Sequence, residues 1–204
     1  MGSVASIHVK AENQSAILKL IQQLSDANEM TYENYPTEAD NYIVGDGKKP
    51  TIVAVSEVKN GWINIFSNYF GKMENWLEAL SRESGAMAIQ VLWQTVSDVY
   101  YFTIYDKGKL RRRIEVYYGD LDSVVDLGEK FIFEKEFLVL QNDEDYENIF
   151  GRDDIEEYCR NLGIELFAKN GQAKFYIFRR KKIGLTLSRW LEKKVTQKPW
   201  WQFW

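Results

Sequence analysis

The chain has 204 residues, with 26 Lys and Arg, 30 Asp and Glu, one His and one Cys, which suits one full-sized domain with a hydrophobic core. A single cysteine excludes an internal disulfide and a thiolate metal site, and a single histidine excludes a multi-histidine metal site. No apolar run approaches the roughly 18 residues of a membrane span, and no secretory signal is visible, so we expect a cytoplasmic protein.

The first 50 residues predict a strand, a helix and a loop. Residues 4–10 alternate polar and apolar side chains, as a half-buried strand does. Asn13 is a candidate helix cap. The apolar residues that follow it at the spacing of one helix face are Ile17, Leu20, Ile21 and Leu24. Residues 25–50 lose this periodicity and contain Pro36 and Pro50, so we expect a long loop there.

The next segment predicts a hairpin and a second helix. The β-branched residues 51–58 and the alternating residues 62–66 flank Asn60-Gly61, a pair that tolerates the positive φ of a tight turn. Helical spacing returns at Met73, Trp76, Leu77 and Leu80. Gly85 is expected to end this helix, because glycine readily adopts the left-handed conformation of a helix C-cap.

The centre of the chain is rich in strand patterns. The predicted strands lie at 86–95, 98–105, 109–118 and 130–140. Tight turns join the first three of them into a meander, and the second turn is Asp106-Lys107-Gly108. Residues 119–128 are acidic and typical of turns.

The remaining residues predict a helix, a hairpin and a last helix. After an acidic connector at 142–154, Asp153 or Asp154 is expected to cap a helix that ends at Gly163. Its apolar side contains Ile155, Tyr158, Cys159 and Leu162. The hairpin is expected from 164–168 and 173–178 around Asn170-Gly171, and the last helix from 186–195, before Pro199.

The order of these elements predicts an α+β fold. Because tight turns join most of the strands, we expect a mainly antiparallel sheet of hairpins and a meander, with about four helices packed on one face. We expect a single domain over residues 1–204. The alternative is a subdivision near residue 145, into an acidic part at 1–145 and a basic helix-hairpin-helix part at 146–204.

Charge is distributed unevenly along the chain. Residues 115–157 hold fifteen acids against three bases, and residues 172–204 hold nine bases against Glu192 alone. Such asymmetry indicates a partner of opposite charge, and the alternative is a pair of solvated faces that keep the domain soluble. The residues expected to contact a partner are Asp120, Asp122, Asp126, Asp143, Glu144, Asp145, Trp200, Trp201 and Trp204.

The three tryptophans belong to a C-terminal segment at 200–204 that has four large aromatic residues. An exposed aromatic cluster of this size would need a use. We therefore consider three alternatives, in which it docks on its own domain or a dimer mate, binds another protein, or lies at a membrane interface beside Lys193, Lys194 and Lys198.

The sequence gives little support for catalysis or metal binding. His8 has no nucleophile or carboxylate that the local pattern supplies, and Cys159 has acidic neighbours, which disfavour a reactive thiolate. The acids at 120–129 fail the spacing of a calcium loop. We therefore expect no catalytic residue, no metal and no cofactor. Basic residues at 107–113 and 179–182 resemble a single-strand nucleic-acid surface, but a pI near 5.3 argues against nucleic acid as a partner. The alternative for these residues is internal pairing with the acidic region 115–157, together with solvated charge.

Two parts of the chain carry a family likeness. The first is residues 90–118, with the Asp98-Val99 strand start and the Lys107–Leu110 turn, and the second is the strand at 53–55 that leads to Gly61-Trp62. Together with the N-terminal strand and helix, residues 3–118 resemble a group of small bacterial α+β domains that look like accessory or immunity-type proteins of interference systems. The relatives carry a His-Asp pair before Ser-Asp, where this chain has Thr95-Val96.

The resemblance and the charge pattern lead to one hypothesis and two alternatives. The hypothesis is a non-enzymatic protein-binding domain of the immunity type, which covers a basic toxin surface with its acidic face. The first alternative is a membrane- or nucleic-acid-associated accessory protein that uses the basic, Trp-rich C-terminal part. The second is an enzyme that works with carboxylates alone, for which no residue stands out.

Overall fold

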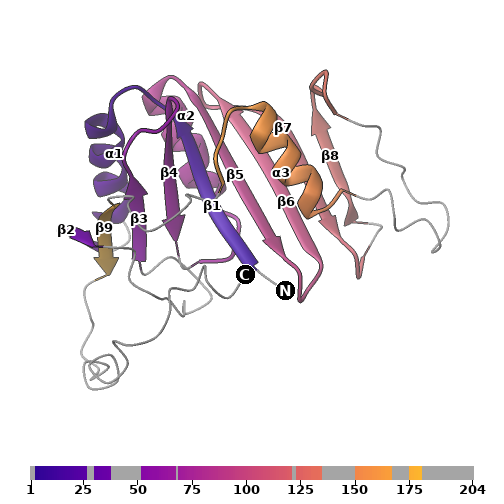
Figure 1. Cartoon of the computed structure of the whole chain (residues 1–204), viewed down its shortest axis with the longest axis horizontal. Coiled ribbons are helices and arrows are strands. Elements are labelled where there is room, and N and C mark those ends of the chain that lie inside the picture. Colours follow the sequence, from indigo (N-terminus) through magenta and orange to yellow (C-terminus); the bar gives the residue numbers. More distant parts are fainter. Residues whose placement is uncertain are drawn as a thin grey trace.

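The computed structural model of the chain describes residues 3–26, 30–37, 52–67, 69–120, 123–134, 150–166 and 175–180. Figure 1 shows how the strands and helices of these residues are arranged. The strands are β1 (Ser3–Lys10), β2 (Met30–Thr37), β3 (Ile52–Ser56), β4 (Trp62–Ser67), β5 (Met87–Gln94), β6 (Val99–Asp106), β7 (Lys109–Tyr117), β8 (Val125–Gly128) and β9 (Phe175–Arg180). The helices are α1 (Gln14–Asp26), α2 (Glu74–Ser84) and α3 (Arg152–Asn161).

The strands form one sheet, in the order β2-β9-β3-β4-β1-β5-β6-β7-β8. Every neighbouring pair is antiparallel, so the predicted α+β class with an antiparallel sheet is confirmed. The described residues hold three helices instead of about four, and the helix predicted at 186–195 lies outside them. Because β9 pairs between β2 and β3, residues on both sides of position 145 belong to the same sheet.

The helices cover both faces of the sheet, so the prediction that they share one face was wrong. α1 and α2 pack on a core that includes Ile7, Val55 and Ile63, whereas α3 packs on the opposite face against Trp93 and Phe102 (Figure 1). The reason lies in β5 and β6, which are buried along almost their whole length. A strand that is apolar on both sides needs a cover on both sides.

The local signals of α1 and α2 predicted these helices correctly. The side chain of Asn13 accepts a hydrogen bond from the Ser15 backbone N–H at 2.9 Å, as a cap does. The apolar stripe of α1 is turned inward, with Ile17 and Ile21 buried. Gly85 ends α2 in the left-handed conformation, at φ 63°.

The first hairpin and the meander are also confirmed. β3 and β4 pair across Asn60 and Gly61, which have φ angles of 53° and 77°. Most residues with a Cβ atom are strained at such angles. Gly, which has no Cβ atom, and Asn adopt them most readily. β5, β6 and β7 pair in succession as predicted, and their ends lie within about one residue of the expected bounds.

Two predictions that concern the strands β2 and β9, on the left-hand side of Figure 1, were wrong. Residues 30–37, expected within a long loop, form β2. Among the described strands, β2 has a neighbour on one side only, which allows Pro36 within it, since an edge strand tolerates a residue without an N–H. The second hairpin is wrong as well, because residues 164–166 form no strand and β9 pairs with β2 and β3 instead. Its turn at 170–171 lies outside the described residues.

Two predictions near β8 were also wrong. Residues 125–128, expected as a turn, form the short strand β8 beside β7. Residues 130–134, expected as the start of a strand, contain a turn in which the Glu134 N–H donates to the Phe131 carbonyl at 3.0 Å. Residues 135–140 lie outside the described part. β8 has only four residues, one half-buried and three exposed, and so short a pattern within an acidic stretch is a weak signal for a strand.

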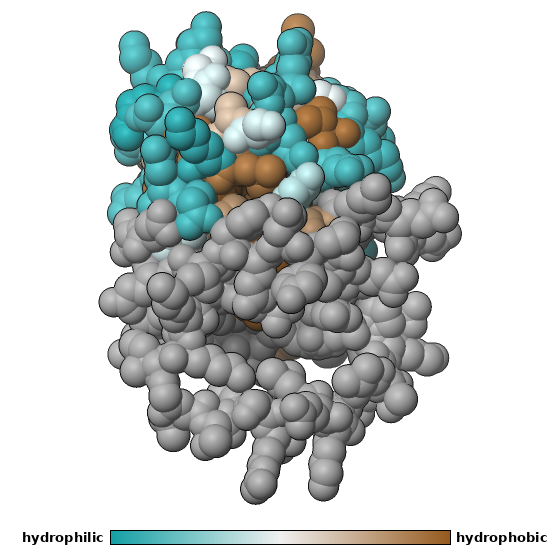
Figure 2. Space-filling model, turned by 90° about the vertical axis from the view of Figure 1, so that its left-hand side faces the viewer, coloured by the Kyte–Doolittle hydropathy of each residue, from teal (hydrophilic) through white to brown (hydrophobic). Residues whose placement is uncertain are grey.

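The end of the molecule that carries α1 shows mainly hydrophilic residues where its surface is described, with hydrophobic residues between them (Figure 2). The outer side of α1 contains exposed Lys19 and Gln23. In the described parts of the chain, no helix is long and apolar enough to cross a membrane.

Candidate protein-binding surface

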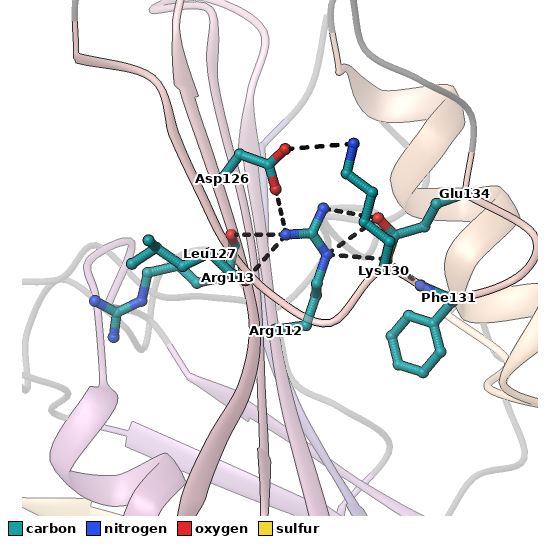
Figure 3. A network of polar contacts seen from close by, with 7 residues as sticks. All are labelled: Arg112, Arg113, Asp126, Leu127, Lys130, Phe131 and Glu134. Carbon is teal, nitrogen blue, oxygen red and sulfur yellow. Dashed lines mark hydrogen bonds and ion pairs between the residues drawn. The ribbon is translucent and has the colours of Figure 1, made fainter.

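Most acids of β7, β8 and the turn after them are neutralised inside the molecule. The centre of the first group is Arg112, whose side chain is 0 % exposed. Its Nε and Nη2 atoms donate to the Glu134 carboxylate at 2.7–3.0 Å. Its Nη1 atom donates to Asp126 and to the Leu127 carbonyl, the latter at 2.9 Å. Figure 3 shows the guanidinium held between the two carboxylates, with Lys130 beside Asp126.

This arrangement explains how a charged side chain can be buried beside α3. Burial by itself would lower the pKa of Arg112, but hydrogen bonds and charge interactions with Glu134 and Asp126 raise it, and the net direction is upward. Arg112 therefore stays a cation whose charge is balanced within the fold. Glu134 and Asp126 are used to stabilise the fold, and they add little free charge to an acidic face.

A second group of ion pairs lies on the other face of β7, where α2 packs. Glu115 is 4 % exposed. It pairs with Lys72, and its Oε1 atom lies 3.7 Å from Arg113 Nε. Arg113 Nη2 in turn donates to Glu74 of α2 at 2.7 Å. Lys72 also lies over the rings of Tyr101 and Tyr117. These pairs fix α2 and the residues before it on the sheet, so Glu115 is not an exposed acid.

The predicted partner-binding residues separate into three groups. Asp120 is exposed at the end of β7, and Asp126 is partly exposed but bound to Arg112. The other predicted residues, Asp122, Asp143, Glu144, Asp145, Trp200, Trp201 and Trp204, lie outside the described residues.

The acids that stay free gather at the end of the sheet where β5 turns into β6 and where β7 ends. We call this surface the acidic end and define it as Asp98, Asp120 and Asp153 around the rings of Tyr100 and Tyr118. All three carboxylates are exposed. Within the described residues, no Lys or Arg forms an ion pair with any of them.

Backbone pairing brings the acidic end together. The Tyr118 N–H donates to the Asp98 carbonyl at 3.1 Å, and the Asp120 N–H donates to the Tyr117 carbonyl at 2.9 Å. The rings of Tyr100 and Tyr118 meet edge to face, with centroids 5.4 Å apart. Burial, Tyr100 and the negative charges of Asp154 and Asp98 raise the pKa of Tyr118 to about 12. Both tyrosines are therefore neutral at pH 7.

Asp153 reaches the acidic end from α3. The helix begins at Arg152, with Gly151 as its N-cap, and the Gly151 N–H donates to the Asp154 carboxylate at 2.8 Å. The prediction that Asp153 or Asp154 is the cap was therefore wrong by two or three residues, and both acids lie in the first turn, where the helix dipole favours them. After burial and Asp98, Asp153 is among the charges that raise the pKa of Tyr100.

Asp98 and Asp153 were missed as candidate contact residues, although the sequence contains a signal for Asp98. Asp98 adopts a positive φ of 47° in the β5–β6 turn, which Asp and Asn tolerate better than most residues. Its position opposite the end of β7 follows from the meander that the sequence predicts. The position of Asp153 depends on how α3 packs across the sheet, for which the sequence has no local signal.

A third polar group surrounds the single histidine. His8 Nδ1 donates to the Asn64 side-chain oxygen at 2.7 Å, and Nε2 accepts the Ser6 hydroxyl at 2.9 Å. Ser, His and Asn thus follow one another in the order of a catalytic triad. However, His8 is 0 % and Ser6 3 % exposed, so a substrate cannot reach the hydroxyl in this structure. Burial lowers the pKa of His8 to about 4, and the bond to Asn64 opposes this shift.

Cys159 is a buried side chain on the inner face of α3. Burial, followed by the charge of Glu156, raises the pKa of its thiol, so little reactive thiolate forms at neutral pH. In the part of the chain that the structure describes, no group of three or more His, Cys, Asp and Glu side chains could hold a metal ion.

Comparisons with protein-family models, with curated proteins and with solved structures found no match.

Proposed function

We propose that this chain is a non-enzymatic protein-binding domain whose acidic end contacts a basic surface of its partner. The observation that carries the proposal is the gathering of Asp98, Asp120 and Asp153 without ion pairs to other described residues. The other described acids of β7 and β8 are largely neutralised by Arg112, Arg113 and Lys72. A fold that balances its buried acids and leaves a group of exposed ones free is suited to electrostatic attraction.

The packing of Tyr100 and Tyr118 also supports the proposal. Tyr100 is buried and Tyr118 is half-buried, and their rings meet edge to face within the acidic end. Tyr118 is therefore the ring that a partner can reach, and aromatic residues are enriched in protein interfaces because they bury a large area at low entropic cost. Beside them Arg152 lies over the Trp93 ring, with its guanidinium carbon 5.8 Å from the centroid, and donates to Glu156 at 2.7 Å. This cation is thus held by Glu156 of its own helix and by Trp93 of β5.

In its concrete form the proposal is an immunity-type protein. The partner is then a toxin with a basic active surface, which the acidic end covers, in line with the resemblance of residues 3–118. Such a partner would associate quickly at low salt, because opposite charges steer the encounter.

The experiment compares association rates after a partner has been isolated with the whole chain as bait. The test variant carries Asp98→Asn, Asp120→Asn and Asp153→Asn. Asn tolerates the positive φ at position 98, so the turn is preserved. The control variant carries Glu12→Gln, Glu57→Gln and Glu129→Gln, which changes the net charge equally at exposed positions elsewhere.

We expect the test variant to associate about tenfold more slowly at low salt, whereas the control changes by less than about twofold. The wild-type rate should fall steeply with added salt, and the test variant should lose most of this dependence. Equal effects of the two variants would contradict a specific acidic end. An association rate that does not depend on salt would favour the Trp-rich C-terminal residues as the contact.

A further inference from the structure

Exposed large apolar side chains gather at one edge of the sheet. Six such residues are exposed in the described part of the chain, and four of them lie on or beside β7 and β8. These four are Leu110, Val124, Leu127 and Ile132. We propose that the outer edge of β8 binds an extended, acidic segment of a partner protein as an added strand, on a surface separate from the acidic end.

The backbone of β8 has hydrogen-bonding groups available for such a strand. Just beyond β8, the Glu129 N–H donates to the Arg111 carbonyl at 3.2 Å. In an antiparallel ladder, alternate residues point their N–H and C=O groups to opposite sides. The backbone groups of Asp126 and Gly128 therefore point away from β7. Both residues are exposed, and no strand of the described residues pairs with this edge.

The edge is held in a fixed shape before any partner arrives. Arg112 donates to the Leu127 carbonyl and to the Asp126 side chain, which ties β8 to β7 (Figure 3). Gly128 has a φ of 93°, and a Cβ atom added there would lie 2.0 Å from the Arg111 carbonyl oxygen. The close approach of the two strands thus requires glycine. A strand that is already ordered loses less conformational entropy on binding.

Side chains around the edge determine what kind of segment it fits. Leu127 lies opposite Arg113 and Leu110 opposite Tyr105, so both leucines are on the face where α2 packs. Leu127 is 49 % exposed. A strand added here would place every second side chain on this face, beside Leu127.

The charge of this region favours acidic residues in the added strand. Lys109 and Lys130 are exposed and Arg111 is partly exposed, whereas Glu129 is the free acid among these neighbours. Asp126 is bound to Arg112 and also forms an ion pair with Lys130 at 3.9 Å. Within the described residues, no acid forms an ion pair with Lys109 or Arg111. In a segment that alternates apolar and acidic residues, the apolar side chains of one face would pack on the leucines. The acidic side chains, on its other face and at its ends, would pair with the cations.

The test uses the whole chain and a fluorescent peptide of about eight residues that alternates Val and Glu, close to the usual length of a strand. Binding is followed by fluorescence anisotropy. Leu127→Asp should weaken binding at least about tenfold, since it removes an apolar contact and its carboxylate repels the glutamates of the peptide. Val96→Asp is the matched control, because Val96 is 76 % exposed in the β5–β6 turn, and it should leave the affinity within about twofold.

Two further peptides test the mode of binding. N-methylation of alternate amides removes every donor on one side of the peptide, so methylation in one of the two registers should abolish binding and methylation in the other should not. A Val-Lys peptide should bind at least about tenfold more weakly than the Val-Glu peptide.

Several outcomes would overturn the proposal. These are no binding of the Val-Glu peptide, equal binding of both methylated forms, or equal losses from Leu127→Asp and Val96→Asp. A dimer of the chain alone that Leu127→Asp dissociates would assign the edge to a second copy instead. The Asp98, Asp120 and Asp153 variant should bind the peptide as the wild type does, so a failure of the proposed function leaves this test intact.

Discussion

Arg112 on β7 and His8 on β1 point to the same face of the sheet and are both completely buried, yet their surroundings differ. Arg112 is bonded to two carboxylates and remains charged. His8 is bonded to a hydroxyl and an amide, and its pKa is lowered to about 4. Arg112 stays charged because two carboxylates lie beside it, and His8 stays neutral because no carboxylate of the described residues is bonded to it. The two sites should therefore respond differently to substitution and to pH.

The largest expected effect is at the charged site. Glu134→Gln would leave Arg112 with one carboxylate, Asp126, which is partly exposed. Breaking a buried ion pair typically costs about 3 to 5 kcal/mol, which for a domain of this size corresponds to roughly 10 °C in Tm. Thermal and urea unfolding measure the loss.

The matched control is the other carboxylate of the same guanidinium. The Asp126 side chain is 39 % exposed, whereas that of Glu134 is 0 % exposed. Asp126→Asn should therefore cost only about 1 kcal/mol, since water screens its contribution. Equal costs for the two substitutions would show that burial does not distinguish them.

The next effect belongs to the neutral site and depends on pH. Between pH 6.5 and about 4, the unfolded chain binds a proton at His8 and the folded chain does not. The free energy of unfolding therefore falls as the pH falls through this window, by about 3 kcal/mol in total from this residue. Below about pH 4 the contribution does not change further.

His8→Gln provides the comparison, because glutamine can bond with Ser6 and Asn64 but does not titrate. Urea unfolding of both proteins from pH 7 to pH 4 separates the histidine from the carboxylates that both share. We expect the variant to lose about 3 kcal/mol less than the wild type over this range. Parallel curves for the two proteins would assign the acid sensitivity to other groups.

The two sites also show how far the sequence alone could lead. The alternation of β1 puts Ser6 and His8 on one face, so this contact follows from a pattern that the sequence contains. Asn64 was not predictable as a partner, because it lies 56 residues from His8 and depends on the pairing of β1 with β4. At Arg112 the pairing of acids and bases was weighed only in general terms, since Glu134 reaches the guanidinium through a turn where a strand was expected.

The fold shows the same division between local and distant information. Helix stripes, the Asn60-Gly61 turn and the meander depend on residues close in sequence, and their prediction was correct. The position of β9 between β2 and β3 joins segments more than 100 residues apart, and no residue pattern within β2 indicates it. β5 and β6 are apolar or aromatic along most of their length, with Gln90 and Thr103 as the interior exceptions, and their burial on both faces explains why α3 covers the second face.

The smallest expected effect concerns the hydroxyl of Ser6. Ser6→Ala would leave His8 Nε2 buried without a donor, and such an unmatched group costs about 1 kcal/mol or somewhat more. Ser25 is the matched control, because it is completely buried and its hydroxyl has no hydrogen-bond partner among the described residues. Ser25→Ala removes an unsatisfied group, so it should leave stability unchanged or raise it slightly. Urea unfolding of both variants at pH 7 measures the difference. A larger loss from Ser25→Ala than from Ser6→Ala would show that the neutral site gains nothing from its hydroxyl, and that burial alone holds His8 in its neutral form.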